Sequence, residues 1–142
     1  MAATNEISLR WLGNMAFEST NPSGKTFRID ASPEDGGEGD GLRPKALMLS
    51  SLAGCSALDI ASMIRKMKLE VSDFRVELTG TLSESQPQTY THVRVAYHFA
   101  GVDLNEAKLQ RAVNLSVEKY CGVIRMFRDF AELEFETYFH QE

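Results

Sequence analysis

The sequence predicts an α+β protein in which antiparallel strands hold one long apolar helix. Two observations carry this prediction. A run of apolar and helix-forming residues fills positions 44–68, and segments before and after it alternate between apolar and polar residues. Alternation with a period of two is typical of half-buried strands. A single apolar helix held against such strands is an α+β arrangement.

The first 42 residues are predicted to form strands joined by turns. Ile7, Leu9 and Trp11 alternate with polar residues, residues 15–19 continue a hairpin, and residues 25–31 form a further strand after the turn at 21–24. The acidic, glycine-rich segment 32–41 is interpreted as a flexible loop. It lacks the GxxxxGK[ST] spacing of a phosphate-binding loop.

The central helix is predicted over residues 44–68. Pro44 suits the first turn of a helix, and Gly54 is the one strong helix breaker that follows. Apolar residues occupy most faces of the run, so most faces must be covered. Serine, glycine and aspartate interrupt it, which favours a buried central helix over a membrane span. Because one chain of this length offers little cover, we expect a homodimer.

The C-terminal part, residues 71–142, is predicted to contain β-β-α-β. Alternating residues give strands near 74–80 and 92–99, joined by a turn at 83–88. A helix is predicted to begin at Asp103, with Glu106 completing a capping box, and to end near Cys121-Gly122. A last strand is predicted over 130–139. The whole chain, 1–142, is expected to be one domain with the order β-β-α-β-β-α-β.

Composition narrows the function classes. The net charge is −5, and no cluster of lysine and arginine is present, which argues against a nucleic-acid partner. The N-terminus lacks the pattern of a signal peptide, so we expect a cytoplasmic protein without a membrane partner. His92, His98 and His140 are scattered and no CxxC motif is present, so we expect no metal and no cofactor.

The two cysteines, Cys55 and Cys121, are the candidate catalytic residues. Most free cysteines are small buried apolar side chains, and both could be no more than that. The alternative is a redox pair, in which one thiolate attacks an oxidant and the other resolves the sulfenic acid as a disulfide. A lowered thiolate pKa would require a nearby cation, hydrogen-bond donor or helix N-terminus. The residues alone leave both interpretations open.

Three segments resemble one known family. They are RPKALMLSSLAGCSALDIASMIRKM, PQTYTHVRVAYHFAG and LQRAVNLSVEKYCGV. Together they are similar to the osmotically inducible protein C / organic hydroperoxide resistance (OsmC/Ohr) family. The resemblance runs from about Gly36 to the C-terminus and is closest to the less characterised OsmC-like branch. It implies an intertwined homodimer whose central helices are clasped by two sheets, with Cys55 as the peroxidatic cysteine and Cys121 as the resolving one.

The sequence departs from the family pattern beside the expected site. The better-characterised peroxidases have a glutamate directly after the proline matched by Pro44, and this chain has Lys45 there. They also carry an activating arginine in the N-terminal region, and neither Arg10 nor Arg28 aligns with it. Asp59, one turn beyond Cys55, is interpreted as a residue of the helix's polar face or of an interface.

The leading hypothesis is a thiol peroxidase that reduces organic hydroperoxides through a Cys55–Cys121 disulfide and is recycled by a dithiol reductant. The apolar surroundings of Cys55 favour greasy hydroperoxides over hydrogen peroxide. One alternative is a non-catalytic protein that binds an apolar small molecule in the dimer pocket. Without the resemblance, a hot-dog-type thioesterase would also fit one long helix wrapped by a sheet.

Overall fold

A computed structural model describes residues 2–142 of the chain. The chain forms two compact units, Met1–Met48 and Leu49–Glu142, and each is described by itself. Helix α1, Pro44–Lys66, begins in the first unit and continues through the second.

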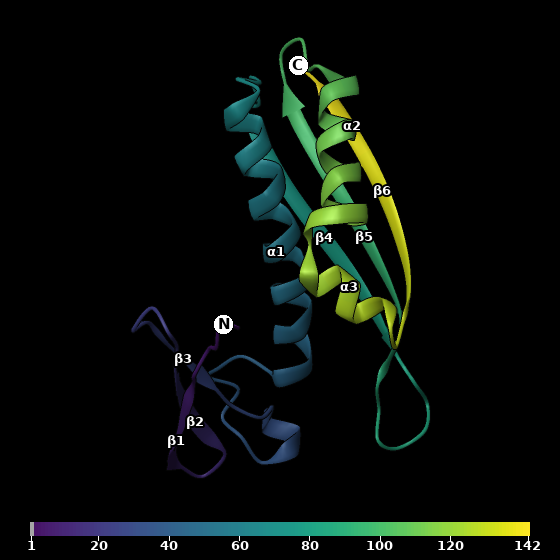
Figure 1. Cartoon of the computed structure of the whole chain (residues 1–142). Helices are drawn as coiled ribbons and strands as arrows, with labels where there is room; N and C mark the ends of the chain where they lie inside the picture. Colours follow the sequence, from purple (N-terminus) through teal and green to yellow (C-terminus); the bar gives the residue numbers. More distant parts are fainter. Residues whose placement is uncertain (1) are drawn as a thin grey trace. The chain divides into compact units, whose positions relative to one another are not determined.

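The N-terminal unit is a three-stranded antiparallel sheet in the order β1-β2-β3 (Figure 1). Its strands are β1 (Ser8–Gly13), β2 (Ala16–Thr20) and β3 (Thr26–Ile29). Gly13 and Asn14 both have positive φ, at 107° and 48°, as tight hairpin turns between twisted strands require. The strands and turns predicted from alternation in this region are present, but they form three strands before α1 where the predicted order has two.

The acidic loop after β3 is held in one shape by a single buried carboxylate. Asp30 accepts backbone N–H groups from Ala31 at 2.8 Å and from Glu38 and Asp40 at 3.2 Å each. Burial alone would raise the pKa of Asp30, but these three N–H groups lower it below its usual value. The loop also contains a short 3₁₀ helix, η1 (Pro33–Asp35), so the predicted flexible connection is a structured one.

The C-terminal unit is a three-stranded sheet with helices on one face (Figure 1). Its strands are β4 (Asp73–Leu82), β5 (Tyr90–Gly101) and β6 (Glu132–Gln141). The helical segments beside α1 are α2 (Glu106–Leu115), the π-helical turn η2 (Ser116–Tyr120) and α3 (Gly122–Arg128). The α+β class predicted from the sequence is confirmed.

The direction of the last strand differs from the prediction. β4 and β5 pair antiparallel, with Val76 opposite Tyr97, whereas β5 and β6 pair parallel, with Val95 opposite Phe135. A parallel pair needs a crossover of a dozen or more residues. Helices α2 and α3 supply it by returning the chain to the end of the sheet at which β5 starts.

The second predicted helix is divided in the structure. Its N-cap is Asn105, whose side chain accepts the N–H of Lys108 at 3.1 Å, and not Asp103. Helix α2 ends at Leu115 and is followed directly by the π turn η2. Cys121 then has an extended backbone, and helix α3 begins after it. A hydrophobic period of 3.6 does not reveal a π turn, because one additional residue leaves the average pattern almost unchanged.

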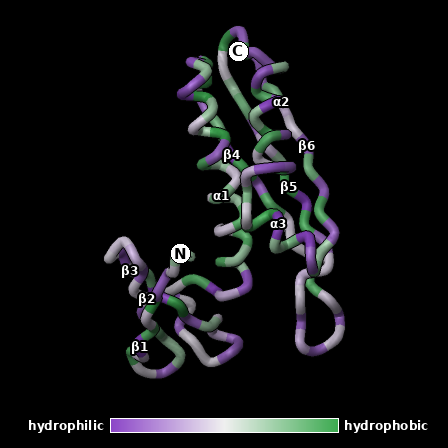
Figure 2. Tube along the Cα trace, viewed as in Figure 1, coloured by the Kyte–Doolittle hydropathy of each residue, from purple (hydrophilic) through white to green (hydrophobic). Residues whose placement is uncertain are grey.

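The core of the C-terminal unit lies between β5 and the helices. Apolar residues from α1, β5, α2 and α3 are almost fully buried there: Leu52, Ile60, Val93, Val95, Tyr97, Phe99, Leu109, Val113, Ile124 and Phe127. Figure 2 shows hydrophobic and hydrophilic residues alternating along these elements. This core fixes the helices on the sheet and thereby the residues of the site.

Within one chain, α1 is covered on one side only. Leu52, Ser56 and Ile60 are its buried residues, whereas Gly54 and Leu58 are exposed. This exposure agrees with the expectation that one chain offers the helix little cover. In the part of the chain that the structure describes, α1 is the one helix long and apolar enough to cross a membrane, with a mean hydropathy of 1.6. Its buried face packs on the sheet, as in a core helix.

Gly80 should be required for the close packing of α1 against the sheet. A Cβ at this position would lie 2.7 Å from the buried Tyr90 ring and 3.0 Å from Leu49 of α1. Gly80→Ala should therefore lower the free energy of unfolding by about 1–3 kcal/mol, measured by chemical denaturation. Gly122→Ala is the control, because a Cβ there meets open space at ordinary φ. Equal stability of the two variants would contradict this packing.

Candidate active site

The structure brings the two cysteines together, although 65 residues separate them in the chain. Cys55 lies in the middle of α1, and Cys121 lies between η2 and α3. The Cys55 side chain lies close enough to the Cys121 thiol to raise its pKa. Neither forms a disulfide, so both are free thiols. Two thiols in contact are the arrangement that disulfide chemistry requires.

Cys121 lies in surroundings that keep its thiol protonated. Only 5% of the residue is exposed, and its sulfur accepts the backbone N–H of Ile124 at 3.4 Å. Burial is the largest cause that raises the pKa of Cys121, to about 11, and the neighbouring Cys55 side chain adds to it. The backbone N–H groups of Val123 and Ile124 oppose the shift. At neutral pH Cys121 is therefore a neutral thiol.

Cys55 is the more accessible member of the pair. It is half-buried in α1, whereas Cys121 is buried. Cys121 itself lines a small pocket of about 260 Å³ together with Arg125 and Arg128. The difference in burial agrees with the peroxidatic and resolving roles that the family resemblance implies for Cys55 and Cys121.

The backbone around Cys121 is fixed from both sides. Its N–H donates to the carbonyl oxygen of Ser116 at 3.0 Å, which closes the π turn. Its own carbonyl oxygen accepts the N–H of Arg125 at 3.2 Å in the first turn of α3. The cysteine thus lies at a junction between two helical segments. Single π-helical turns of this kind are frequent at functional sites.

A network of buried side chains lies next to the thiols. The Ser56 hydroxyl contacts the Tyr97 hydroxyl at 2.7 Å and the Ser116 hydroxyl at 2.8 Å. Ser116 Oγ also lies 3.0 Å from the Asp59 carboxylate, to which it can donate. We call Ser56, Asp59, Tyr97 and Ser116 the hydroxyl network. It joins α1, β5 and the start of the π turn, and Ser56 directly follows Cys55.

Tyr97 titrates far above neutral pH in this network. Burial raises the pKa of Tyr97 to about 12, and the hydrogen bond to Ser56 opposes the shift. At the high pH where Tyr97 titrates, the negative charges of Cys121 and Asp59 raise the pKa of Tyr97 further. These influences show that the phenol lies close to both groups and stays neutral, so that it can donate a hydrogen bond.

The three cations considered beside the family's activating pair, Lys45, Arg28 and Arg10, all belong to the N-terminal unit. Lys45 is exposed in the first turn of α1. Arg28 forms an ion pair with Asp40 at 2.9 Å on the N-terminal unit, and Arg10 is exposed on β1. Asp59 is partly buried and accepts a hydrogen bond from Ser116 beside the site, which extends its interpretation as a polar-face residue.

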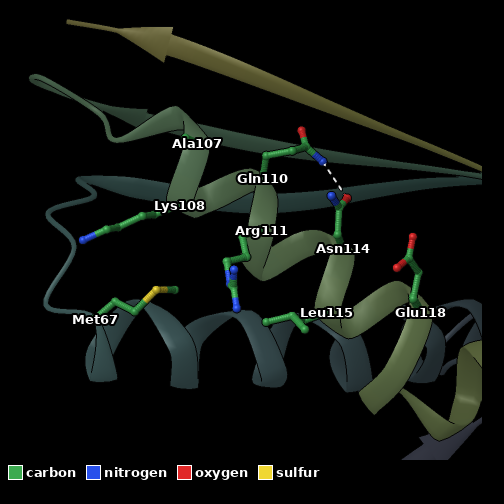
Figure 3. A pocket seen from close by; sticks show the side chains of 8 residues that line it. All are labelled: Met67, Ala107, Lys108, Gln110, Arg111, Asn114, Leu115 and Glu118. Atoms are coloured by element: carbon green, nitrogen blue, oxygen red, sulfur yellow. Dashed lines mark hydrogen bonds between the residues drawn. The ribbon is translucent and has the colours of Figure 1, made fainter.

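Two grooves lie beside α1 and α2. The first has a volume of about 920 Å³ and is shown in Figure 3; it is lined by Met67, Ala107, Lys108, Gln110, Arg111, Asn114, Leu115 and Glu118. The second, of about 620 Å³, shares Met67, Arg111 and Leu115 with the first and extends to Asp59 and Tyr120. Apolar methionines and leucine combined with basic side chains could hold an amphipathic molecule.

The histidines form contacts on the sheet. His92 Nε2 lies 2.9 Å from a Glu134 oxygen, and the rings of His98 and His140 approach to 3.0 Å between nitrogens. Across residues 2–142, no group of three histidine, cysteine or acidic side chains is placed to hold a metal ion. The structure therefore adds no candidate metal ligand to those considered from the sequence.

Sequence reasoning missed three of the four members of the hydroxyl network. Ser56 and Ser116 are single polar residues on apolar helical faces, and Tyr97 lies within the strand predicted near residues 92–99. The sequence offers one sign of such a network: a polar residue at a position where the helical period predicts an apolar one. It could not reveal that the three hydroxyls meet, because they are far apart in the sequence.

An α+β protein with a free thiol pair against its central helix is the class that these observations define. The family described as OsmC-like protein matches residues 37–136. Protein YhfA of Escherichia coli K12 is 33% identical over 121 residues, which cover 85% of this chain and 87% of that protein. The chain therefore belongs to the OsmC-like family, and the resemblance stated from its motifs is confirmed.

Solved structures agree with this assignment. A hypothetical protein from Aquifex aeolicus has a TM-score of 0.86 at 29% identity and covers 99% of both chains. An organic hydroperoxide resistance protein OsmC from Legionella pneumophila has a TM-score of 0.69 at 18% identity, with 97% of this chain and 98% of that one covered. These likenesses show a shared fold, and the hot-dog-type alternative is no longer needed.

The contact between the thiols predicts how Cys121 titrates in two variants. In Cys55→Ala the side-chain interaction that helps to raise the pKa of Cys121 is lost, so this pKa should fall below about 11. It should stay above the usual value because burial remains. Cys55→Ser, which keeps a polar partner, should retain more of the shift.

The measurement is the rate of alkylation of Cys121 by iodoacetamide as a function of pH. The thiolate is the reactive form, so the rate rises as pH passes the pKa. The midpoint should be lower in Cys55→Ala than in Cys55→Ser. Identical midpoints at the ordinary cysteine value would show that Cys121 is neither buried nor paired in solution.

Proposed function

We propose that this protein is a thiol peroxidase that reduces organic hydroperoxides through a Cys55–Cys121 disulfide. The observation that carries the proposal is the proximity of a half-buried and a buried thiol. Membership of a family that includes organic hydroperoxide resistance proteins supports it.

The proposed reaction has two chemical steps. The Cys55 thiolate attacks the distal oxygen of the hydroperoxide, the O–O bond breaks, and the alcohol leaves with a proton while Cys55 becomes a sulfenic acid. The Cys121 sulfur then attacks the Cys55 sulfur, the S–O bond breaks, and the hydroxide takes the Cys121 proton to form water. A dithiol reductant returns the resulting disulfide to two thiols.

The surroundings of the thiols favour an organic oxidant. The partly buried residues packed against the same core as Cys55 include Leu49, Met63 and Ile64 of α1. Such side chains gain from contact with an apolar substituent and offer nothing to hydrogen peroxide. A cytoplasmic location, where thiols are kept reduced, fits a cycle that ends with reduction by a dithiol.

We propose that the working form is a homodimer. Gly54, Leu58 and Ala61 follow one another at helical spacing along the exposed side of α1, and 74% of Leu58 is exposed. Apart from its chain neighbours and the backbone of its own helix, no atom of the described residues lies within 4 Å of a Cβ built at Gly54. Small residues of this kind allow close approach of a second helix. A second copy of α1 would cover the apolar surface that one chain leaves in water.

The peroxidase proposal predicts different results for the two cysteine variants. Cys55→Ser should reduce the consumption of cumene hydroperoxide to the background rate, because the attacking sulfur is lost. Cys121→Ser should still consume one equivalent, since Cys55 is intact, and then stop as a sulfenic acid in the absence of added thiol. Both variants replace a thiol by a hydroxyl, so each is the steric control for the other. Unchanged consumption by Cys55→Ser would contradict the assignment.

The dimer proposal predicts the effect of a charge on α1. Leu58→Glu would bury an unpaired carboxylate in the interface at a cost of about 3–5 kcal/mol, which weakens association at least about a hundredfold. Size-exclusion chromatography with light scattering at micromolar concentration should find a dimer for the natural chain and a monomer for this variant. Val102→Glu, a change at an exposed apolar residue after β5, should remain dimeric. A stable monomer of the natural chain would contradict the proposal.

The second candidate function is binding of an apolar small molecule without catalysis. The second groove, of about 620 Å³, favours this function, because Met63, Met67 and Leu115 give it apolar lining. Native mass spectrometry of freshly purified protein separates the two functions. A bound apolar molecule together with unreactive thiols supports binding, whereas an empty protein with reactive thiols supports the peroxidase.

A further inference from the structure

The hydroxyl network connects the two cysteines by a second route besides their own contact. Ser56 is the chain neighbour of Cys55, and its hydroxyl contacts that of Ser116 at 2.8 Å. The carbonyl oxygen of Ser116 accepts the N–H of Cys121 at 3.0 Å. Cys121 then returns to Cys55 through the proximity of the two thiols. These four residues close a ring of contacts around the reacting sulfurs.

Ser116 is the link on which this ring depends. It is fully buried, and its hydroxyl can donate to the Asp59 carboxylate at 3.0 Å or to the Ser56 carbonyl oxygen at 3.4 Å. The same residue begins the π turn that ends at Cys121. A single side chain therefore attaches the segment that carries one cysteine to the turn of α1 that carries the other.

Burying these hydroxyls would be costly without partners, and the structure gives each of them one. Among residues 2–142, no buried side-chain nitrogen or oxygen lacks a hydrogen bond. A satisfied polar network fixes one arrangement of the elements that it joins, whereas an apolar contact tolerates sliding. A π turn contains one residue more than a regular α-helical turn. The buried hydroxyls therefore help to fix the hydrogen-bond register of this segment.

We propose that the Ser116 hydroxyl is the positioning group that keeps Cys121 within reach of Cys55 while the disulfide closes. Disulfide closure within one protein is fast only if the two sulfurs are held near bonding geometry, and a misplacement of about 1 Å can cost about a hundredfold in rate. The proposal rests on the redox role of the thiol pair proposed above. Ser56 is the partner of Ser116 in the hydroxyl contact and positions Cys121 through Ser116.

The test separates attack at Cys55 from closure by Cys121, using the aromatic disulfide DTNB and no peroxide. The Cys55 thiolate attacks DTNB, a Cys55–sulfur bond forms as the DTNB disulfide breaks, and one coloured thiolate leaves. Cys121 then attacks the Cys55 sulfur, the Cys55–Cys121 bond forms, and the second coloured thiolate leaves while the Cys121 proton passes to solvent. Cys121→Ser should release only the first.

Ser116→Ala should leave the first release close to that of the natural chain and slow the second by about ten- to a hundredfold. Ser56→Ala removes the other hydroxyl of the contact and should slow the same step, which keeps the test valid if one variant does not fold. Val93→Ala is the control: it truncates a fully buried core residue that lies about 13 Å along β5 from Tyr97. It should lose stability and keep both rates.

The pH dependence distinguishes positioning from a change in the chemistry of the thiol. If Ser116 positions Cys121, the second release in Ser116→Ala is slower by the same factor at every pH. A shifted pH profile, an unchanged second release in both serine variants, or equal slowing in Val93→Ala would overturn the inference. If the natural chain releases both thiolates but does not consume hydroperoxide, the positioning role stands and the peroxidase proposal fails.

Discussion

The structure of the C-terminal unit depends on the packing of α1 against β5. Leu52 and Ile60 of α1 are buried on either side of Ser56, whose hydroxyl contacts Tyr97 of β5 in the middle of the interface. The apolar residues supply the free energy of burial, and the hydrogen bond fixes the rotation of the helix on the sheet. Because Cys55 precedes Ser56, this packing also determines where the reactive sulfur lies.

Function follows from what the remaining elements add to this packing. The crossover from β5 to β6 carries the π turn and α3, and the junction between them places Cys121 against Cys55. Burial keeps the thiol of Cys121 protonated, whereas Cys55 is only half-buried. A pair with this asymmetry suits a cycle in which one sulfur is oxidised and its neighbour resolves the product.

Much of the fold, and the identity of the thiol pair, could be predicted from the sequence. Alternation and apolar runs located the strands and α1, and the motifs around Cys55 and Cys121 identified the OsmC-like family. The parallel direction of β6 and the π turn could not be predicted, because direction depends on the crossover and the turn does not alter the average period. The hydroxyl network required three distant residues to be seen together, which no local pattern provides.

The central claim is that Cys55 and Cys121 form a redox pair. Intact mass with counting of free thiols, before and after one equivalent of an organic hydroperoxide, tests it most directly. The account predicts the loss of two hydrogens and of both thiols in the natural chain, and an added oxygen in place of the disulfide in Cys121→Ser. Two thiols that remain reduced and unreactive would contradict it.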